Sequence, residues 1–564
     1  MVFDKQVDVL VVGSGAGALV AALRAARAGA DVLVVEKGAM WGGTSATSGG
    51  GIWIPGSHLA EQAGHPDDLG EAFRYVRALT ADNVADDQIH AFVDNAHRML
   101  AWVEQEADVQ YAALPYPDYY PEVAGSREGY RTHLIPTAFD ARKMDQAAFD
   151  TMQRASPAAS LWGRINWVLA ETHIALFRPK GWWKTIGKAL AGYWLDFPQR
   201  LRSPRDRRLT LGTALLGRLR SAVDRTGTPV WLNSPFVSLI ETDGRVEGAV
   251  VQHEGRELRI GARKGVILAA GGFERNAALR AEHLAAAHDP VASGSQVNNR
   301  GDALLATLTL GAATRNMDSA WWAPMFRIPG EDRARLSTVE RALPYSLIVD
   351  QSAKRYANEA LSYHRFGEVM KAPHAPGAET NPSWLIFDSR YRNSYPAGPV
   401  IPGIPDALLP ASVRKVLVKG STVADLAKGT GLDTVTLEAT ITRFNGMVAK
   451  GKDEDFGRGD SAYDRLYGDP RVSPNPSLGA VAKAPFYAIP LHLGDIGTNG
   501  GLVTDGRGRV LREDGGTIQG LYAVGNLAAS VMGYSYPGAG ATLGPAMTFG
   551  FLAATDACRI NEPV

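Results

Sequence analysis

The first 36 residues carry the pattern that most limits what this chain can fold into. An apolar, β-branched run at 7–12 precedes G-x-G-x-x-A at 13–18, an alanine-rich segment at 19–28 and a second apolar run at 31–35, which ends at Glu36. This arrangement predicts a nucleotide site in a parallel α/β sheet, because a strand, a glycine turn, a helix, a second strand and an acid follow one another within about 30 residues. The glycines let backbone approach a pyrophosphate, and Glu36 is expected to bind ribose. A glycine turn in another α/β fold is the alternative, which the complete arrangement disfavours.

A second glycine-rich loop, at 42–51, distinguishes between the possible cofactors. It reads GGTSATSGGG and follows Glu36 closely. A nicotinamide site does not need such a loop beyond the acid. A flavin does, because its ribityl chain and ring extend past the first turn, where hydroxyls and bare amides can line them. The sequence therefore predicts FAD.

Two later segments extend this cofactor site. The runs 265–273 and 520–526 read as buried strands that end in Gly-Gly and Gly-Asn. A helix is expected from about Gly544, and its N-terminus could stabilise negative charge on the reduced flavin. The 515–555 span has no charged residue and suits the floor of a cofactor cavity. The candidate FAD-binding residues are Gly13, Ser14, Gly15, Ala16, Gly17, Ala18, Glu36, Lys37, Gly42, Gly43, Thr44, Ser45, Ser48, Gly49, Gly50, Gly51, Ala270, Gly271, Gly525, Asn526, Gly540, Thr542 and Leu543.

Composition excludes several other classes of protein. The 564 residues allow two to four domains, and 59 Lys and Arg balance 59 Asp and Glu, so no global basic excess indicates nucleic acid. Cys558 is the single cysteine, which excludes an internal disulfide, fits a reducing compartment and makes a metal site unexpected. The uncharged stretches 38–60 and 515–555 are interrupted by glycine and proline, so neither predicts a spanning helix, and no signal peptide is expected before the first strand.

The motifs together resemble the flavoprotein family of fumarate reductases and 3-ketosteroid dehydrogenases, and within it the 3-ketosteroid Δ1-dehydrogenases. The resemblance covers nearly the whole chain, and the set is far more specific than any one motif. The segments that carry it are GGTSATSGGGIWIP at 42–55, YPDYY at 116–120, RKGVILAAGGFERN at 263–276, DSAWWAP at 318–324, DEDFGRGD at 453–460 and YPGAGATLGPAMTFG at 536–550.

The resemblance implies an α/β fold with two parts. A Rossmann-type FAD-binding domain is expected from both chain ends, at 1–276 and 489–564. An inserted α+β catalytic domain is expected at 277–488. The active site is then expected in the crevice between them, with the flavin as one wall.

The resemblance also implies the reaction and the residues that perform it. Introducing a C1–C2 double bond into a 3-ketosteroid removes a proton from C2 and a hydride from C1. Tyr363 matches the family's base, and Tyr119 matches a second tyrosine that hydrogen-bonds to it. Tyr536 and the backbone N–H of Gly540 match the donors to the ketone oxygen. Because free tyrosine has a pKa of about 10, we expect the hydrogen bond from Tyr119 to stabilise the phenolate.

Each of these assignments has a competitor in the sequence. Most of the 18 tyrosines are expected to be packing residues, and Tyr116 and Tyr120 compete with Tyr119. The family's Asp-Arg-Leu after the base appears here as His-Arg-Phe at 364–366. An aromatic residue of the family's pocket falls near Val339, and Tyr345 or Leu347 could substitute for it.

Residues 154–208 form an insertion with an unusual composition. Five of the 12 tryptophans lie here, and 11 Lys and Arg against three Asp and Glu give a local charge of +8. Tryptophan with basic residues is typical of segments in a membrane interface. We expect monotopic or peripheral attachment to an anionic membrane surface on the cytoplasmic side. A buried helical hairpin and a nucleic-acid patch are the alternatives.

The favoured function is an FAD-dependent 3-ketosteroid Δ1-dehydrogenase that accepts sterols with a C17 side chain. A 3-ketosteroid Δ4-dehydrogenase or a fumarate-reductase-like enzyme of the same fold is the enzyme alternative. A dicarboxylate enzyme would need convergent Arg and His, whereas Tyr536 and a glycine run are expected here. A non-catalytic, flavin-containing membrane-binding module is the remaining alternative. The expected electron acceptor is external, such as a quinone, because no second nucleotide motif is evident.

Overall fold

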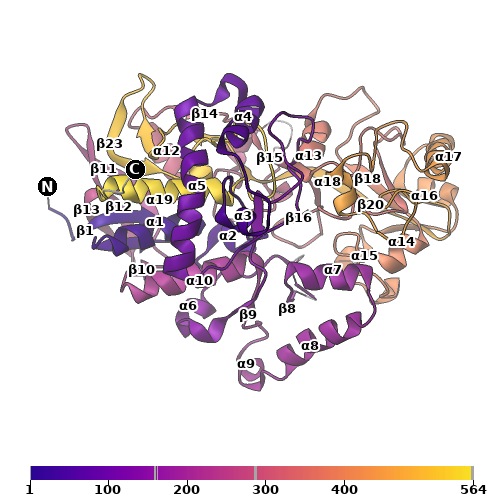
Figure 1. Ribbon diagram of the computed structural model, residues 1–564, viewed down its shortest axis with the longest axis horizontal. Coiled ribbons are helices and arrows are strands. Elements are labelled where there is room, and N and C mark those ends of the chain that lie inside the picture. Colours follow the sequence, from indigo (N-terminus) through magenta and orange to yellow (C-terminus); the bar gives the residue numbers. More distant parts are fainter. Residues whose placement is uncertain (1, 158–159, 162, 285–286, 288, 561–564) are drawn as a thin grey trace.

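The predicted nucleotide-binding unit is present at the N-terminal end of the chain. The computed structural model in Figure 1 describes residues 2–157, 160–161, 163–284, 287 and 289–560. Strand β1 (Lys5–Val12) leads through the glycine turn into helix α1 (Ala16–Arg27), and strand β2 (Val32–Val35) lies parallel to β1. The helix begins three residues before the predicted segment, so the end of the glycine motif is itself helical.

These strands belong to an eight-stranded sheet built from distant parts of the chain. A later strand, β13, pairs in parallel with β1, and β23 pairs in parallel with β13. Strands β11 and β12 extend the sheet as an antiparallel arm. The main path runs β10 (Val230–Trp231), β2, β1, β13 (Arg256–Leu268), β12 (Arg245–His253), β23 (Thr517–Ala523), β22 (Arg509–Leu511), with β11 (Phe236–Thr242) on β12. Strands β13 and β23 are shorter at their C-terminal ends than predicted. Gly271 and Gly525 follow with φ of +78° and +66°, which extended strands do not adopt.

Helices from both chain ends cover this sheet. Helix α19 (Leu543–Ala557) lies beside α1, while α5 (Asp86–Ala107) and α10 (Leu211–Arg225) complete the layer (Figure 1). Helices α1 and α19 pack so closely that their backbones are in contact. A Cβ atom on Gly17 would lie 2.5 Å from the carbonyl oxygen of Ala546, and one on Gly550 would lie 2.4 Å from that of Gly17. Glycine is therefore required at this crossing.

The middle of the chain forms a second, antiparallel sheet, on the right in Figure 1. Helix α13 (Tyr363–Lys371) packs on β15, where a Cβ on Gly367 would lie 2.5 Å from the carbonyl carbon of Trp322. The boundary expected at 488/489 falls inside β20. The strand order is β16 (Arg335–Leu336), β15 (Ala320–Phe326), β20 (Phe486–Thr498), β18 (Ser383–Phe387), β17 (Ser346–Val349), with β19 (Val418–Gly420) on β20.

A small sheet connects the flavin loop to the first candidate tyrosine. Strand β3 (Ile52–Trp53) follows the glycine loop and pairs with β5 (Thr132–Leu134), which pairs in turn with β4 (Ala112–Ala113). The segment that contains Tyr119 is the connection between β4 and β5. The sheet therefore fixes that connection beside the glycine loop.

The insertion folds into three helices at the lower edge of Figure 1: α7 (Leu169–Phe177), α8 (Trp182–Trp194) and α9 (Phe197–Arg202). Trp167 and Tyr193 are buried, whereas Trp183 and Trp194 are exposed. Trp162 lies outside the described residues. Within the part of the chain that the structure describes, no helix combines the length and the apolar character needed to cross a bilayer.

Candidate active site

The first glycine turn forms a closely packed backbone bend between β1 and α1. Gly13 has a φ of +109°, and a Cβ atom there would lie 2.3 Å from the carbonyl oxygen of Ala269. Helix α1 has Gly15 as its N-cap, and Gly15 provides no side chain to cap the helix. The N–H of Ala16 donates to the Ser45 hydroxyl at 3.1 Å, which brings the two predicted cofactor loops together.

Glu36 is buried at the end of β2, where a ribose-binding acid was expected. Its carboxylate accepts hydrogen bonds from the Ser14 hydroxyl at 2.5 Å and from the N–H of Gly38 at 2.8 Å. Burial raises the pKa of Glu36, and these hydrogen bonds oppose the shift. Lys37, which was also predicted to contact the cofactor, forms an ion pair with Asp302.

The second glycine loop contains helix α2 (Gly43–Thr47), which is tied to a segment that sequence reasoning did not single out. The Thr44 hydroxyl accepts hydrogen bonds from the N–H of Gln296 at 3.2 Å and from the Asn299 amide at 3.1 Å. Asn299 also donates to Glu274 at 2.7 Å. A Cβ atom on Gly271 would lie 2.8 Å from the Asn299 side-chain oxygen, so the Gly-Gly turn also touches this segment.

The C-terminal glycine segment lines a pocket. Gly525, Asn526 and Thr542, all predicted cofactor residues, are among its lining residues. The same pocket contains two buried polar atoms, the indole nitrogen of Trp321 and the amide oxygen of Asn499, which have no partner among the described residues. Buried polar groups are normally hydrogen-bonded, so a polar ligand fits this pocket.

The three candidate catalytic tyrosines come together from three distant segments. The ring centroids of Tyr119 and Tyr363 are 5.7 Å apart, and those of Tyr363 and Tyr536 are 5.4 Å apart. Tyr119 and Tyr536 stack at 5.7 Å with an interplanar angle of 18°. Tyr116 and Tyr120 have no described ring contact with Tyr363. The ring of Tyr120 lies under the Arg365 guanidinium instead.

Tyr119 is positioned by contacts on both sides of its backbone. Its N–H donates to the carbonyl of Pro537 at 2.8 Å, so the Tyr119 and Tyr536 segments are directly joined. Arg365 donates to the carbonyl of Tyr119 at 3.1 Å. Asp118 is buried and accepts from the indole of Trp53 at 2.8 Å and from Arg131 at 3.0 Å. Arg365, the residue of His-Arg-Phe that the family pattern shares, thus supplies a contact to Tyr119.

Tyr363 is the first residue of α13. The Ser362 hydroxyl, at the N-cap, accepts from the N–H of Arg365 at 3.4 Å. Arg341 is buried and donates to the carbonyls of Glu359 at 2.8 Å and Leu361 at 3.0 Å, immediately before the helix. The start of α13, and with it the Tyr363 side chain, is therefore fixed by a buried cation.

Burial dominates the acidity of the three tyrosines. It raises the pKa of Tyr119 and of Tyr363 well above the ordinary value. It also raises the pKa of Tyr536, although hydrogen bonding from Tyr363, Thr542 and the backbone of Gly540 opposes the shift. The Tyr119 hydroxyl is buried without a hydrogen-bond partner in the described structure. The contact with the Tyr119 side chain acts to lower the pKa of Tyr363, as expected, but burial outweighs it.

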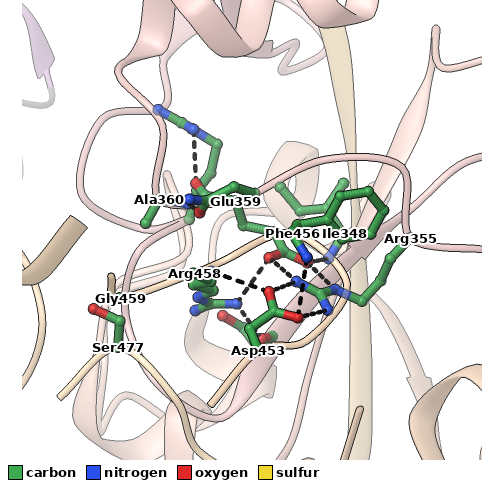
Figure 2. Close-up of polar contacts among 12 residues, drawn as sticks. Ile348, Arg355, Glu359, Ala360, Asp453, Phe456, Arg458, Gly459 and Ser477 are labelled. Carbon is green, nitrogen blue, oxygen red and sulfur yellow. Dashed lines mark hydrogen bonds and ion pairs between the residues drawn. The ribbon is translucent and has the colours of Figure 1, made fainter. Parts of the chain in front are cut away.

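A buried ion network lies behind the Tyr363 segment (Figure 2). Arg355 pairs with Glu359 and with Asp453, both at 2.7 Å, and Arg458 lies 3.4 Å from Glu359. None of the four side chains is more than 4% exposed. The network joins the 453–460 motif to the chain just before Tyr363, so this motif has a clear structural role.

Three comparisons with known proteins show the family of the chain. Residues 8–543 match the family model for an FAD binding domain. The 3-oxosteroid 1-dehydrogenase of Mycobacterium tuberculosis is 40% identical, covering 98% of both chains. A crystal structure of 3-ketosteroid Δ1-dehydrogenase from Sterolibacterium denitrificans, in complex with 1,4-androstadiene-3,17-dione, is similar with a TM-score of 0.93 at 41% identity, covering 99% of this chain and 100% of that one.

The chain belongs to the FAD-binding family of the 3-oxosteroid 1-dehydrogenases. It is an FAD-dependent oxidoreductase of the α/β flavoprotein fold. A further member of similar length is the 4-oxocyclohexanecarboxylate 2-dehydrogenase of Sinomonas cyclohexanicum, which is 36% identical and is covered over 92% of its length by 97% of this chain.

The residues of this 3-oxosteroid 1-dehydrogenase relative fit FAD in two observable respects. Gly13, Gly50 and Gly540 leave no room for a side chain. Two residues that line the pocket at Gly525 and Asn526, Trp321 and Asn499, each carry a buried polar atom without a partner among the residues described. When bound, FAD supplies the hydride acceptor for oxidation of a C–C bond.

Sequence reasoning missed several residues around Tyr363 in this 3-oxosteroid 1-dehydrogenase relative. Trp321 meets Tyr536 edge to face at 5.1 Å, and Met325 and Ile496 belong to the apolar cluster against which Tyr363 packs. The DSAWWAP motif could have indicated Trp321. Leu347 lies in a different cluster from Tyr363, and the ring of Tyr345 lies 4.4 Å from the Arg390 guanidinium.

Proposed function

We propose that the protein is an FAD-dependent 3-ketosteroid Δ1-dehydrogenase, with Tyr363, Tyr119, Tyr536 and Gly540 at the reacting centre. The observation that carries the proposal is the convergence of three tyrosines from separate segments, with all ring centroids within 6 Å of one another. The family's 3-oxosteroid members support the choice of substrate. The cofactor residues remain those of the three glycine-rich segments and Glu36.

In this proposal the chain's own groups handle the proton and the ketone. Tyr363 takes the proton from C2, while Tyr536 and the N–H of Gly540 donate to the ketone oxygen and stabilise the developing enolate. The backbone of Gly540 acts to lower the pKa of Tyr536, so the two donors lie close together. FAD, held by the three glycine-rich segments and Glu36, would supply the acceptor for the hydride from C1.

The raised pKa of Tyr363 restricts how it can act as a base. Because burial disfavours a free phenolate, Tyr363 accepts the C2 proton only as its own proton passes to a neighbouring oxygen. Tyr119 is the adjacent candidate, because its buried hydroxyl has no partner among the described residues.

The substrate is best supported as a large apolar ketone. Tyr363 packs against a cluster that includes Met325 and Ile496, and Trp321 lies beside Tyr536. A relative that acts on 4-oxocyclohexanecarboxylate indicates a second candidate, a small cyclic ketone acid oxidised by the same loss of proton and hydride. We favour sterols with a C17 side chain and an external acceptor such as a quinone.

Anaerobic flavin bleaching tests the proposed function. The holoenzyme is mixed separately with androst-4-ene-3,17-dione, cholest-4-en-3-one, 4-oxocyclohexanecarboxylate and succinate, and the product is identified by mass spectrometry and NMR. We expect rapid bleaching with both steroids and a new C1–C2 double bond. In a further mixture with saturated 5α-androstane-3,17-dione, a product with a C4–C5 double bond would instead indicate a Δ4-dehydrogenase. Bleaching by succinate alone, or by no ketone, would refute the proposal.

We also propose that the 154–208 insertion attaches the enzyme peripherally to an anionic membrane on the cytoplasmic side. The support is an apolar surface on α8 and α9, where Trp183 is 63%, Trp194 57% and Leu201 91% exposed. Such clusters on a soluble surface mark interaction sites. The local charge of +8 favours anionic lipid, and the buried Tyr193 hydroxyl, which donates to Pro204, stabilises the fold of the helices beneath.

Co-sedimentation with vesicles tests this attachment. Trp183, Trp194 and Leu201 are replaced together by serine, and a control protein carries Leu408→Ser and Val435→Ser, two apolar residues that are 74% and 76% exposed elsewhere. Loss of three inserted apolar side chains should weaken binding at least about tenfold. The control should bind like the unmodified protein, and high salt should remove only the ionic part. Equal vesicle binding by all three proteins, or none by the unmodified protein at low salt, would refute the attachment.

The division of the chain accompanies this proposal. We assign cofactor binding to 1–276 and 489–564, with substrate binding and the base at 277–488, and place the reaction between them. Tyr119 and Tyr536 then come from the first part and Tyr363 from the second.

A further inference from the structure

The tyrosine cluster extends beyond the three residues used above. Tyr463 lies on helix α18 (Ala462–Leu466), and its ring centroid is 5.0 Å from that of Tyr119, the shortest tyrosine–tyrosine ring contact in the described structure. Tyr116 contacts Tyr463 at 6.0 Å. The hydroxyls of Tyr116 and Tyr467 are hydrogen-bonded at 2.7 Å. Adjacent tyrosine side chains therefore continue away from Tyr363 through Tyr119.

The cluster runs from the interior towards the surface. Tyr119 is 1% and Tyr463 5% exposed, whereas Tyr116 and Tyr467 are both partly exposed. Tyr363 is itself partly exposed, and a bound substrate would cover that exposed part. The proton would then need a path through the protein, and the buried Tyr119 and Tyr463 offer one.

The surroundings of Tyr463 suit a residue that passes protons between Tyr119 and Tyr116. Burial raises its pKa to about 12, and the nearby hydroxyls of Tyr116 and Tyr119 together with the charge of Arg341 oppose a larger rise. The negative charge of Asp464 instead raises the pKa of Tyr463. The buried Tyr119 hydroxyl has no partner among the residues described, so it can turn to either neighbour as protons move.

The 453–460 motif holds the second half of this path in place. Its Gly459 donates through its N–H to Asp464, the residue after Tyr463, at 3.0 Å. Asp464 also accepts from the Asn358 amide at 2.9 Å, five residues before Tyr363. The same buried contacts thus fix Tyr363 and Tyr463 relative to each other.

We propose that Tyr463, with Tyr116 and Tyr467 beyond it, forms a proton relay that carries the C2 proton from the Tyr363–Tyr119 pair to solvent. The inference rests on the proposed function, because it requires Tyr363 to be the base. Tyr463 is a relay residue that touches neither substrate nor cofactor.

The proposed relay conserves atoms and electrons and needs no additional reactant. The C–H bond at C2 breaks, and its electron pair enters the enolate as the proton binds the Tyr363 oxygen. Each hydroxyl in the series accepts one proton and passes its own onward, and the last proton is delivered to water. With the hydride on the flavin, each turnover releases one proton to solvent, and no tyrosine is oxidised or permanently ionised.

The test compares flavin bleaching with proton release in a single anaerobic turnover. Holoenzyme in weak buffer with an indicator dye is mixed with androst-4-ene-3,17-dione, and both signals are followed. Tyr463→Phe keeps the ring and removes the hydroxyl. We expect kcat to fall about 10²-fold with little change in KM, and proton release to lag behind bleaching, since a positioned proton-transfer group contributes about 10²–10⁴-fold. The solvent deuterium isotope effect on kcat should rise.

Two further variants keep the relay falsifiable. Tyr522→Phe removes a partly buried hydroxyl bonded to Asp556 at 2.9 Å, outside the cluster, and should keep release and bleaching synchronous. Tyr467→Phe removes only the outer hydroxyl of the relay, so proton release should lag behind bleaching by less than in Tyr463→Phe. This variant still tests the relay if Tyr463→Phe folds poorly. Synchronous, unmodified rates in both cluster variants would overturn the relay while leaving the function intact. Failure of the unmodified enzyme to bleach would refute the proposed function and the relay with it.

Discussion

Replacing Glu359 by glutamine tests whether the buried network in Figure 2 holds the catalytic half together. The Glu359 carboxylate accepts two hydrogen bonds from Arg355, both at 2.7 Å, and one from the N–H of Ile348 at 3.2 Å, and it lies 3.4 Å from Arg458. With Asp453, two carboxylates balance two guanidinium groups. Glutamine would leave a net buried positive charge and place an amide N–H against guanidinium donors.

Breaking a buried ion pair by removing one partner costs about 3–5 kcal/mol. For a folding unit of about 200 residues, each kcal/mol lowers Tm by roughly 2–4 °C, so Glu359→Gln should lower Tm by about 6–20 °C. The assay is thermal unfolding of the holoenzyme by circular dichroism. Glu454→Gln is the matched control, because its 3.0 Å pair with Lys450 is 47% and 64% exposed and should contribute under about 1 kcal/mol. A Tm for Glu359→Gln within 2 °C of this control would refute the reasoning, where 2 °C is about the effect of 1 kcal/mol.

Three further results are expected. Tyr363→Phe should abolish turnover yet retain FAD absorbance and steroid binding in difference spectra; turnover like that of the unmodified enzyme would remove Tyr363 from the mechanism. Tyr536→Phe should lower kcat about 10²–10³-fold by removing one donor to the ketone, and an unchanged rate would make Tyr536 structural. Burial lowers the pKa of His133, His364 and His492 to about 4. Because the unfolded histidines titrate near 6.5, unfolding free energy should fall as pH drops from 6.5 to 4, by up to about 3 kcal/mol each; urea midpoints that do not change over this range would contradict this.

Local patterns predicted the cofactor half well. The strand, glycine turn and helix at 5–27 are fixed by neighbours within a few residues, and both later strands were found although their ends were wrong. The positive φ of Gly271 and Gly525 ends each strand earlier, and a side-chain pattern does not reveal φ. Whether the predicted residues contact FAD stays a prediction.

The candidate site was accessible to sequence reasoning only through family resemblance. Nothing local brings together Tyr119, Tyr363 and Tyr536, because the antiparallel sheet and the β3–β5 pairing decide which distant loops meet. Tyr463 was missed for the same reason, although the motif at 453–460 precedes it directly. Sequence reasoning provided no measure of how strongly burial would raise the pKa of Tyr363 against the opposing contact with Tyr119, since burial is a tertiary property.

The contact between α1 and α19 has a consequence for how the chain is made. The nucleotide-binding helix is synthesised almost first, yet its glycine-to-glycine partner at Gly550 is synthesised more than 500 residues later. Strand β13 likewise lacks β23 until about 250 more residues have been added. At about 5–20 residues per second, the emerging chain has about 12–50 s with an open sheet edge. Flavin capture is then a late event in biogenesis, and the middle of the chain has time to fold before it.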